Sequence, residues 1–115
     1  MANTFKLVTK AGVTSADVIY TVAGSTTTVV LGFMLGNTTT SQITATVTIE
    51  SDTSNRSGAN NEANQNVELV TNAPIPSGAS LELLAGNKVI METTDVLKLT
   101  ATGATDIALS IMEIT

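Results

Sequence analysis

The stretch QITATVTIES, residues 42–51, decides the fold class of this chain. Its apolar residues alternate strictly with polar ones, so one face of an extended segment is apolar and the other is polar. Such alternation is typical of an antiparallel strand that is buried on one side only. We therefore expect residues 42–51 to form a half-buried strand, with Ile43, Val47 and Ile49 in the core.

Other segments of the chain carry a similar extended pattern. Threonine is the commonest residue, and valine and isoleucine are plentiful. β-Branched side chains pack well on a pleated sheet and lose rotamer freedom in a helix. The further expected strands are residues 5–9, 17–22, 27–35, 67–70, 80–84, 88–92, 96–100 and 106–114. The sequence thus predicts an all-β antiparallel sandwich, jelly-roll-like, with eight or nine short strands.

Glycine and asparagine mark bends and turns between these strands. Residues 27–35 are more apolar than the others, as expected of a strand covered on both sides, and Gly32 within them predicts a bulge or bend. Gly36 and Asn37 predict the turn back toward residue 42. Residues 85–87, Ala-Gly-Asn, predict a hairpin between residues 80–84 and 88–92.

With 115 residues, the chain is expected to form one domain, 1–115. Residues 51–66 are a polar loop without a large apolar side chain, either a solvated insertion or a projection that touches a partner. Residues 1–16 form an N-terminal segment that contains a strand or extends as an arm. The N-terminus lacks the basic and apolar regions of a signal peptide, and no apolar run is long enough to span a bilayer.

The composition argues against most catalytic chemistry. The chain has no cysteine, histidine or tryptophan, which removes thiol nucleophiles, Cys/His zinc sites and Ser-His-Asp triads. Phosphate-binding glycine loops are absent, and Phe5, Tyr20 and Phe33 are too few to build a sugar platform. A net charge of −5 disfavours nucleic acids and anionic membranes as partners. We expect no enzyme and no cofactor.

A calcium site in the polar loop is the strongest metal candidate, because calcium prefers several oxygen ligands. The spacing does not match an EF-hand, since Asn64 stands where the loop would need its closing glutamate. We therefore expect no metal here. The oxygen-bearing residues concerned are Asp52, Asn55, Asn60, Asn61, Glu62 and Asn64.

Two segments are candidates for contact with a partner. Pro74, Ile75 and Pro76 form a rigid extended segment, because proline fixes φ and lacks an N–H; it is either a corner between sheets or a docking edge. In the last expected strand both faces are apolar, so this strand is central or lies at a subunit contact. Met112 and Ile114, on the face opposite Leu109, are the expected interface, with the proline segment beside them.

Several segments together resemble small virion structural proteins of tailed bacteriophages, particularly marine ones. They are residues 72–82, 86–92 and 107–115, with residues 20–23 and 28–32 fitting the same pattern. The resemblance spans roughly residues 17–115.

This resemblance implies a β-sandwich on the virion, made in the host cytoplasm. The expected function is a capsid decoration protein on the outside of the assembled head, bound to the major capsid protein or another virion protein. A homo-oligomer, for example a trimer, is expected. The alternatives are a tail or neck (head–tail connector) component, or a host-surface or carbohydrate-binding module that reads its ligand through residues 51–66.

Overall fold

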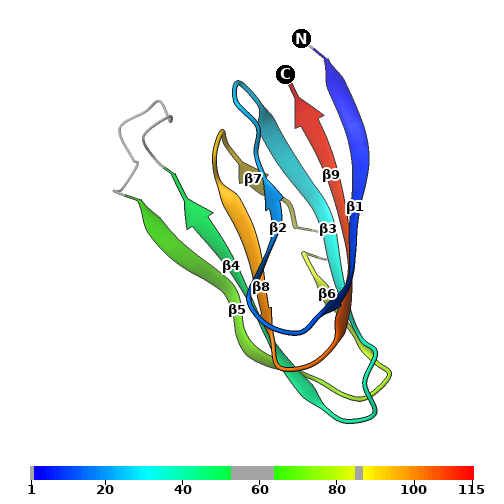
Figure 1. The fold of residues 1–115 in the computed structure, drawn as a ribbon. Coiled ribbons are helices and arrows are strands. Elements are labelled where there is room, and N and C mark those ends of the chain that lie inside the picture. Colours follow the sequence, from blue (N-terminus) through cyan, green and yellow to red (C-terminus); the bar gives the residue numbers. More distant parts are fainter. Residues whose placement is uncertain (1, 53–63, 85–86) are drawn as a thin grey trace.

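The computed structural model describes residues 2–52, 64–84 and 87–115 (Figure 1). Within these residues the regular structure is all strand, and no helix is long and apolar enough to cross a membrane. The strands are β1 (Asn3–Val13), β2 (Asp17–Thr21), β3 (Thr27–Asn37), β4 (Ile43–Ser51), β5 (Gln65–Ile75), β6 (Ser80–Leu83), β7 (Val89–Met91), β8 (Val96–Ala101) and β9 (Thr105–Ile114). The predicted all-β class is confirmed.

The strands form two antiparallel sheets that pack face to face (Figure 1). Sheet A has the order β1-β9-β3-β6, and β7 also pairs with β3; sheet B has the order β2-β8-β4-β5. The chain changes sheet after β1, β2, β3, β5, β7 and β8. Because β6 and β7 occupy one position along β3, there are eight strand positions, which gives the order of a jelly roll. The predicted sandwich is confirmed.

The alternation in β4 places its apolar residues in the core. Ile43, Ala45 and Val47 are buried, while the intervening threonines stay partly exposed. Ile49, also expected inside, is half-buried and packs against the same core. Both sheets contribute to one hydrophobic cluster, whose fully buried large side chains are Val22, Val30, Phe33, Leu35, Val47, Ile75, Met91, Leu97, Leu99, Leu109 and Ile111.

β9 is a central strand, as expected from its two apolar faces. It lies between β1 and β3, and it turns Ile107, Leu109 and Ile111 into the core. Its partner β3 shifts register between Val30 and Gly32, so the bulge predicted at the glycine is present.

The hairpin predicted around residues 85–87 is wrong, because β6 and β7 do not pair with each other. β6 pairs with residues 33–36 of β3, and β7 pairs with residues 28–30 of the same strand. The two strands pair with successive parts of β3, and residues 85 and 86 of the expected turn lie outside the described residues. β3 likewise leads into the opposite sheet rather than into a hairpin with β4.

The N-terminal segment is not a projecting arm. β1 pairs with β9 from Asn3 to Lys10, and a register shift precedes the last pair at Val13. The predicted polar loop is also shorter than expected at both ends, because β4 and β5 extend into it and pair Ser51 with Gln65. Residues 53–63 of that loop lie outside the described residues.

Candidate interaction surface on the outer face of sheet A

A row of large apolar side chains crosses the outer face of sheet A. Phe5 of β1 lies opposite Met112 of β9, Met112 lies opposite Val29 of β3, and Val29 lies opposite Ile90 of β7. Directly opposed residues share one face of a sheet. Phe5 is 71% exposed and Ile90 is 66% exposed, so the two ends of this row are open to solvent.

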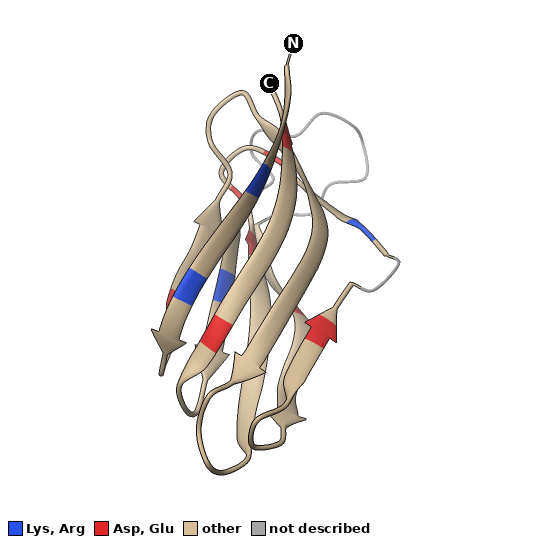
Figure 2. Cartoon of the chain, turned by 90° about the vertical axis from the view of Figure 1, so that its right-hand side faces the viewer, with Lys and Arg blue, Asp and Glu red and all other residues tan. Residues whose placement is uncertain are grey.

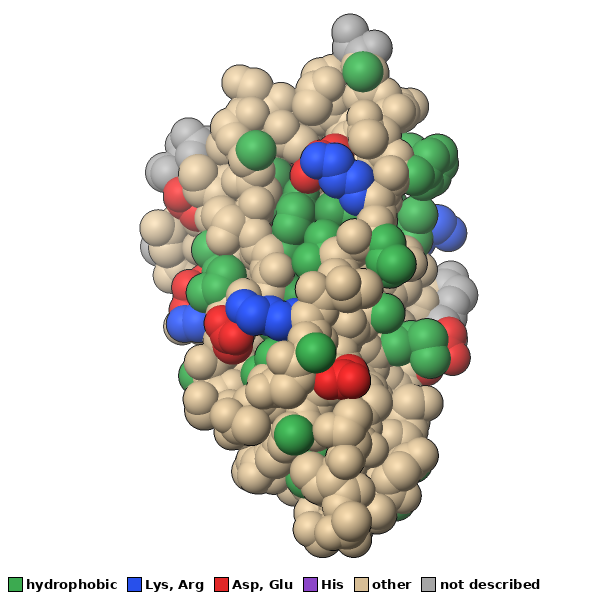
Figure 3. All heavy atoms as spheres, turned by 45° about the vertical axis from the view of Figure 1, so that its right-hand side comes forward, with side chains coloured by type: hydrophobic (Ala, Val, Ile, Leu, Met, Phe, Trp, Pro, Cys, Tyr) green, Lys and Arg blue, Asp and Glu red, His purple; other side chains and the backbone are tan. Residues whose placement is uncertain are grey.

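More apolar residues adjoin this row on the same face. Leu7, 64% exposed, lies opposite Ser110, and Met34, 46% exposed, lies opposite Ala108. Figure 3, which brings β1 forward, shows hydrophobic side chains reaching the surface on the flank formed by sheet A. We call this surface the apolar face and define it as Phe5, Leu7, Val29, Met34, Ile90, Ala108, Met112 and Ile114.

Among the strand residues that face outward on sheet A, the charged ones are confined to one half of the face. The chain ends meet where Ala2 and Thr115 exchange backbone hydrogen bonds, and we call this side of the sandwich the terminal end. Glu82, opposite Met34, and Asp106, opposite Gly36, lie toward the other end. β3 carries no charged residue along its length (Figure 2).

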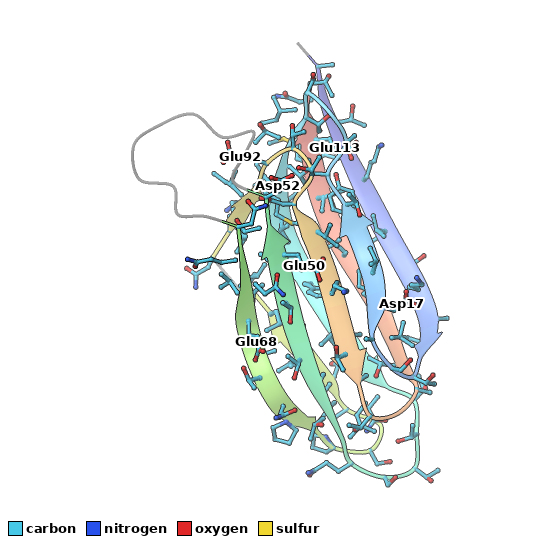
Figure 4. All side chains as sticks on the ribbon, turned by 60° about the vertical axis from the view of Figure 1, so that its left-hand side comes forward. Asp17, Glu50, Asp52, Glu68, Glu92 and Glu113 are labelled. Atoms are coloured by element: carbon cyan, nitrogen blue, oxygen red, sulfur yellow. The ribbon has the colours of Figure 1, made fainter. Side chains whose placement is uncertain are left out.

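The outer face of sheet B is more polar, although Val18 of β2, opposite Lys98, is 42% exposed there. Its β4 side chains include threonines, and Lys98 of β8 forms a 2.8 Å ion pair with Glu50 of β4. Glu68 of β5 accepts a hydrogen bond from Thr71. Figure 4 shows Glu50 and Glu68 on this side of the molecule. An antiparallel sheet with one solvated face is ordinarily polar on that face, so sheet B is the ordinary case and sheet A is the exception.

The predicted interface is only partly brought together. Met112 and Ile114 are half-buried and lie on the apolar face near the terminal end. Ile75 is 1% exposed and belongs to the core, so its assignment to the interface is wrong; in an extended strand its side chain points inward because it lies opposite Ile43. Pro74 and Pro76 are exposed.

The proline segment also lies far from Met112 and Ile114, which corrects the expectation that it lies beside them. β5 ends at Ile75 in sheet B and β6 begins at Ser80 in sheet A, so the intervening residues cross between sheets. At this corner the Asn37 amide nitrogen donates to the carbonyl oxygens of Ser41, Ile75 and Pro76 at 2.8, 2.9 and 3.2 Å. This is the end opposite the termini, because Asn37 pairs with the first residue of β9.

Of the apolar face, sequence reasoning assigned only Met112 and Ile114 to the interface. The large side chains that it missed are Phe5, Leu7, Val29, Met34 and Ile90. In β1 the alternation of apolar and charged residues is misleading, because Lys6, opposite Ile111, rather than Phe5 lies on the inner face of sheet A, where its side chain stays 52% exposed at the sheet edge. The inward position is possible because Lys6 forms a 2.7 Å ion pair with Glu113 and Lys10 a 2.8 Å ion pair with Asp17. The signal that was available is that β3, like β9, is apolar on both of its faces.

A polar cluster closes the edge of the sandwich between β1 and β2. The Tyr20 phenol donates to Oε2 of Glu113 at 2.5 Å and lies 2.7 Å from Oγ1 of Thr28. Burial, together with the hydrogen bond to Glu113, raises the pKa of Tyr20 to about 12. The Lys6 ammonium and the Tyr20 phenol, both bonded to Glu113, lower the pKa of that carboxyl. The cluster links β1, β2, β3 and β9.

The carboxylates at the terminal end of sheet B accept hydrogen bonds from residues in and beside the turns. Asp95, 1% exposed, accepts the backbone N–H groups of Asp52 and Glu92 at 2.8 and 3.0 Å. Asp52 accepts the hydroxyl of Thr94. Figure 4 shows Asp52 and Glu92 at this end. Among the described residues no three acidic side chains are grouped to hold a metal ion; the calcium candidates Asn55, Asn60, Asn61 and Glu62 lie outside them.

A shallow hollow is lined by Thr9, Lys10, Ala11, Asp106 and Ile107. Its two ionisable groups have structural partners. Asp106 accepts the backbone N–H of Gly12 at 2.9 Å, and Lys10 donates to the carbonyl oxygen of Val18 while pairing with Asp17. These two side chains therefore stabilise the bend at the end of β1. The apolar face is the stronger candidate for function.

Comparison of the chain with protein-family models, with curated proteins and with solved structures gives no match.

Proposed function

We propose that this chain is a non-enzymatic structural protein of a phage particle, a decoration protein that binds the outside of the assembled head through its apolar face. The observation that carries the proposal is the contrast between the two outer faces. One sheet presents Phe5, Leu7 and Ile90 to solvent, each more than 60% exposed, while the other presents threonines, an ion pair and the smaller apolar side chain of Val18.

An apolar face of this kind is stabilised when a partner covers it. Exposed apolar patches of several large side chains mark interaction surfaces in soluble proteins. Fully burying one such side chain contributes about 2 kcal/mol, so the exposed members of the face together supply much of the free energy that a stable contact needs. The polar outer face of sheet B then remains in water.

The phage setting is supported by the resemblance of the chain to small virion proteins. The jelly-roll order agrees with it, since viral capsid domains use this fold, but lectins and cupins use it as well. Fold alone does not decide function. The partner we propose is the major capsid protein or another virion protein, and neither nucleic acid nor membrane takes part.

A tail or neck location is the alternative within the same class, because the same face would serve there. A carbohydrate-binding module is less favoured. Sugar sites use aromatic platforms, yet Phe33 is fully buried and the Tyr20 phenol is bonded to Glu113, which leaves Phe5 as the single exposed aromatic ring of the described residues.

The experiment is a density map of phage heads lacking this protein, recorded with and without the purified chain. The proposal predicts added density on the outer shell, with sheet A against the capsid protein. Added density at the tail or neck would favour the alternative location. No added density anywhere on the particle would contradict the proposal.

A further inference from the structure

The four sheet edges differ in how they are protected against pairing with another chain. β2 is short and shifts register after Val18, and β5 has two register shifts and contains Pro74 as its penultimate residue. The edge of sheet A at β6 and β7 is interrupted. β1 instead pairs regularly from Asn3 to Lys10, with neither proline nor bulge over that span. Bulges, prolines, short strands and inward-pointing charges protect sheet edges. Of these, β1 carries only the charges of Lys6 and Lys10 between Asn3 and Lys10, and both charges are paired within the chain, with Glu113 and Asp17. β1 is therefore the most open of the four edges.

The hydrogen bonds between β1 and β9 identify which residues of β1 turn their N–H and C=O groups toward this open edge. Ala2 and Thr115 exchange both of their backbone hydrogen bonds, at 3.1 and 2.9 Å, and the same register continues through the pairing of Asn3 with Ile114. In an antiparallel ladder only every second residue bonds to a given neighbour. The even residues of β1 therefore bond to β9, and the N–H and C=O groups of Asn3, Phe5, Leu7 and Thr9 point outward. No other described strand lies beyond β1 (Figure 1).

We propose that β1 pairs antiparallel with β1 of a second copy about a two-fold axis that passes through Leu7. Leu7 then lies opposite Leu7 of the other copy, and Phe5 lies opposite Thr9. All of these are outward-bonding residues, so their N–H and C=O groups meet as hydrogen-bonded pairs. The contact joins the two copies of sheet A into one continuous sheet.

The lysines select this register from the neighbouring ones. Outward-bonding residues also meet if the axis passes through residue 6 or residue 8. An axis at residue 6 places Lys6 opposite Lys6, and an axis at residue 8 places Lys6 opposite Lys10; like charges directly opposed destabilise a strand pair. With the axis at Leu7, Lys6 lies opposite Val8 and Lys10 lies opposite Thr4.

Each lysine also has a partner within its own copy, Glu113 for Lys6 and Asp17 for Lys10. The pairing places Leu7, which is 64% exposed in the single chain, beside Leu7 of the other copy, and it extends the apolar face across two copies. A second copy is the partner that fits. In this register the outward N–H and C=O groups of the two β1 strands meet each other, and no like charges are directly opposed. This inference does not depend on the proposed function, since the dimer forms without a phage particle.

The absence of cysteine from the chain allows a direct test by disulfide formation. Residues opposed in a hydrogen-bonded pair have Cα atoms about 5.5 Å apart, a distance that a disulfide spans. Leu7→Cys should form disulfide-linked dimers under mild oxidation. Ile90→Cys is the matched control, because Ile90 is 66% exposed on the other edge of the same sheet. We expect Leu7→Cys to cross-link on the order of tenfold faster than the control, because pairing raises the effective thiol concentration. Equal rates would overturn the proposal.

A second variant measures the dimer without cross-linking. Leu7→Pro removes an N–H that points away from β9, so the fold keeps its β1–β9 hydrogen bonds while the edge loses a donor. Sedimentation velocity should show dimers for the wild type and monomers for Leu7→Pro, with unchanged circular dichroism. A wild type that stays monomeric across the accessible concentrations would overturn the proposal, as would a folded Leu7→Pro that dimerises like the wild type.

Discussion

Tyr20 of sheet B and Glu113 of sheet A are joined by a 2.5 Å hydrogen bond that closes one edge of the sandwich. The bond is supported on the Glu113 side by Lys6 and on the Tyr20 side by Thr28. A polar network that connects both sheets fixes their relative position in a way that apolar packing alone does not.

The first prediction concerns the titration of this tyrosine, the single one in the chain. Its folded pKa of about 12 lies above the unfolded value near 10. The stability that comes from the neutral phenol is therefore complete below pH 10 and is lost as the pH rises through about 12. A spectrophotometric titration should show tyrosinate only at this high pH, and Glu113→Gln should lower the pKa because it removes a negative charge. Tyrosinate formation near pH 10 in the folded protein would contradict the network.

The second prediction concerns the buried corner at Asn37. Its amide nitrogen donates to three carbonyl oxygens, and Asn37→Asp would set a carboxylate oxygen against them. We expect a loss of about 3 kcal/mol or more in the free energy of unfolding, measured by urea denaturation at neutral pH. Asn72→Asp is the control, because Asn72 is exposed and uses its side-chain oxygen as an acceptor. Equal losses of unfolding free energy for the two substitutions would show that the three hydrogen bonds donated by Asn37 do not stabilise the corner.

The third prediction concerns close packing at Gly103. A Cβ added there would lie 2.6 Å from Cγ2 of Ile43 and 3.3 Å from Cγ2 of Thr39. We expect Gly103→Ala to destabilise the fold by about 1–3 kcal/mol, because the core residue must shift. A Cβ added at Gly24 would meet no atom within 4 Å apart from its own chain neighbours, so Gly24→Ala should be neutral or slightly stabilising. Thermal unfolding of both variants distinguishes them, and a stable Gly103→Ala would mean that the corner is looser than its geometry indicates.

The fourth prediction concerns the centre of the core. Val47 is fully buried between Leu99 of β8 and Val70 of β5 in the pairing of sheet B. Val47→Asp should prevent folding, because an unpaired charge would enter the apolar interior. Thr48→Asp, one residue along on the outer face, should fold. A cooperative melting transition of Val47→Asp at the wild-type temperature would show that the assignment of faces in β4 is reversed.

The sequence determined the fold class because period-two alternation is a local property. In β4 it assigned Ile43 and Val47 to the core correctly, and the two apolar faces of β9 indicated a central strand. Alternation does not say which strands pair. The turn residues 85–87 therefore predicted a hairpin, whereas the long β3 offers a partner to both β6 and β7.

The candidate site was predicted in part, for a related reason. Met112 and Ile114 were identified because apolar residues on both faces of one strand are visible in the sequence. Phe5 and Leu7 were not, because the inward position of Lys6 depends on a carboxylate more than a hundred residues away along the chain. Ile75 was assigned to the interface from its proline neighbours, but its position opposite Ile43 places it in the core.

We propose that the apolar face of sheet A binds the phage shell. The most direct test is co-sedimentation of purified variants with heads that lack the protein. Met112→Glu places a charge in the middle of the row between Phe5 and Val29, and Thr100→Glu places the same charge on the exposed outer side of sheet B. The account predicts that Thr100→Glu binds like the wild type and that folded Met112→Glu loses on the order of tenfold or more in affinity. Full retention of folded Met112→Glu on the heads, or loss of binding by Thr100→Glu alone, would contradict it.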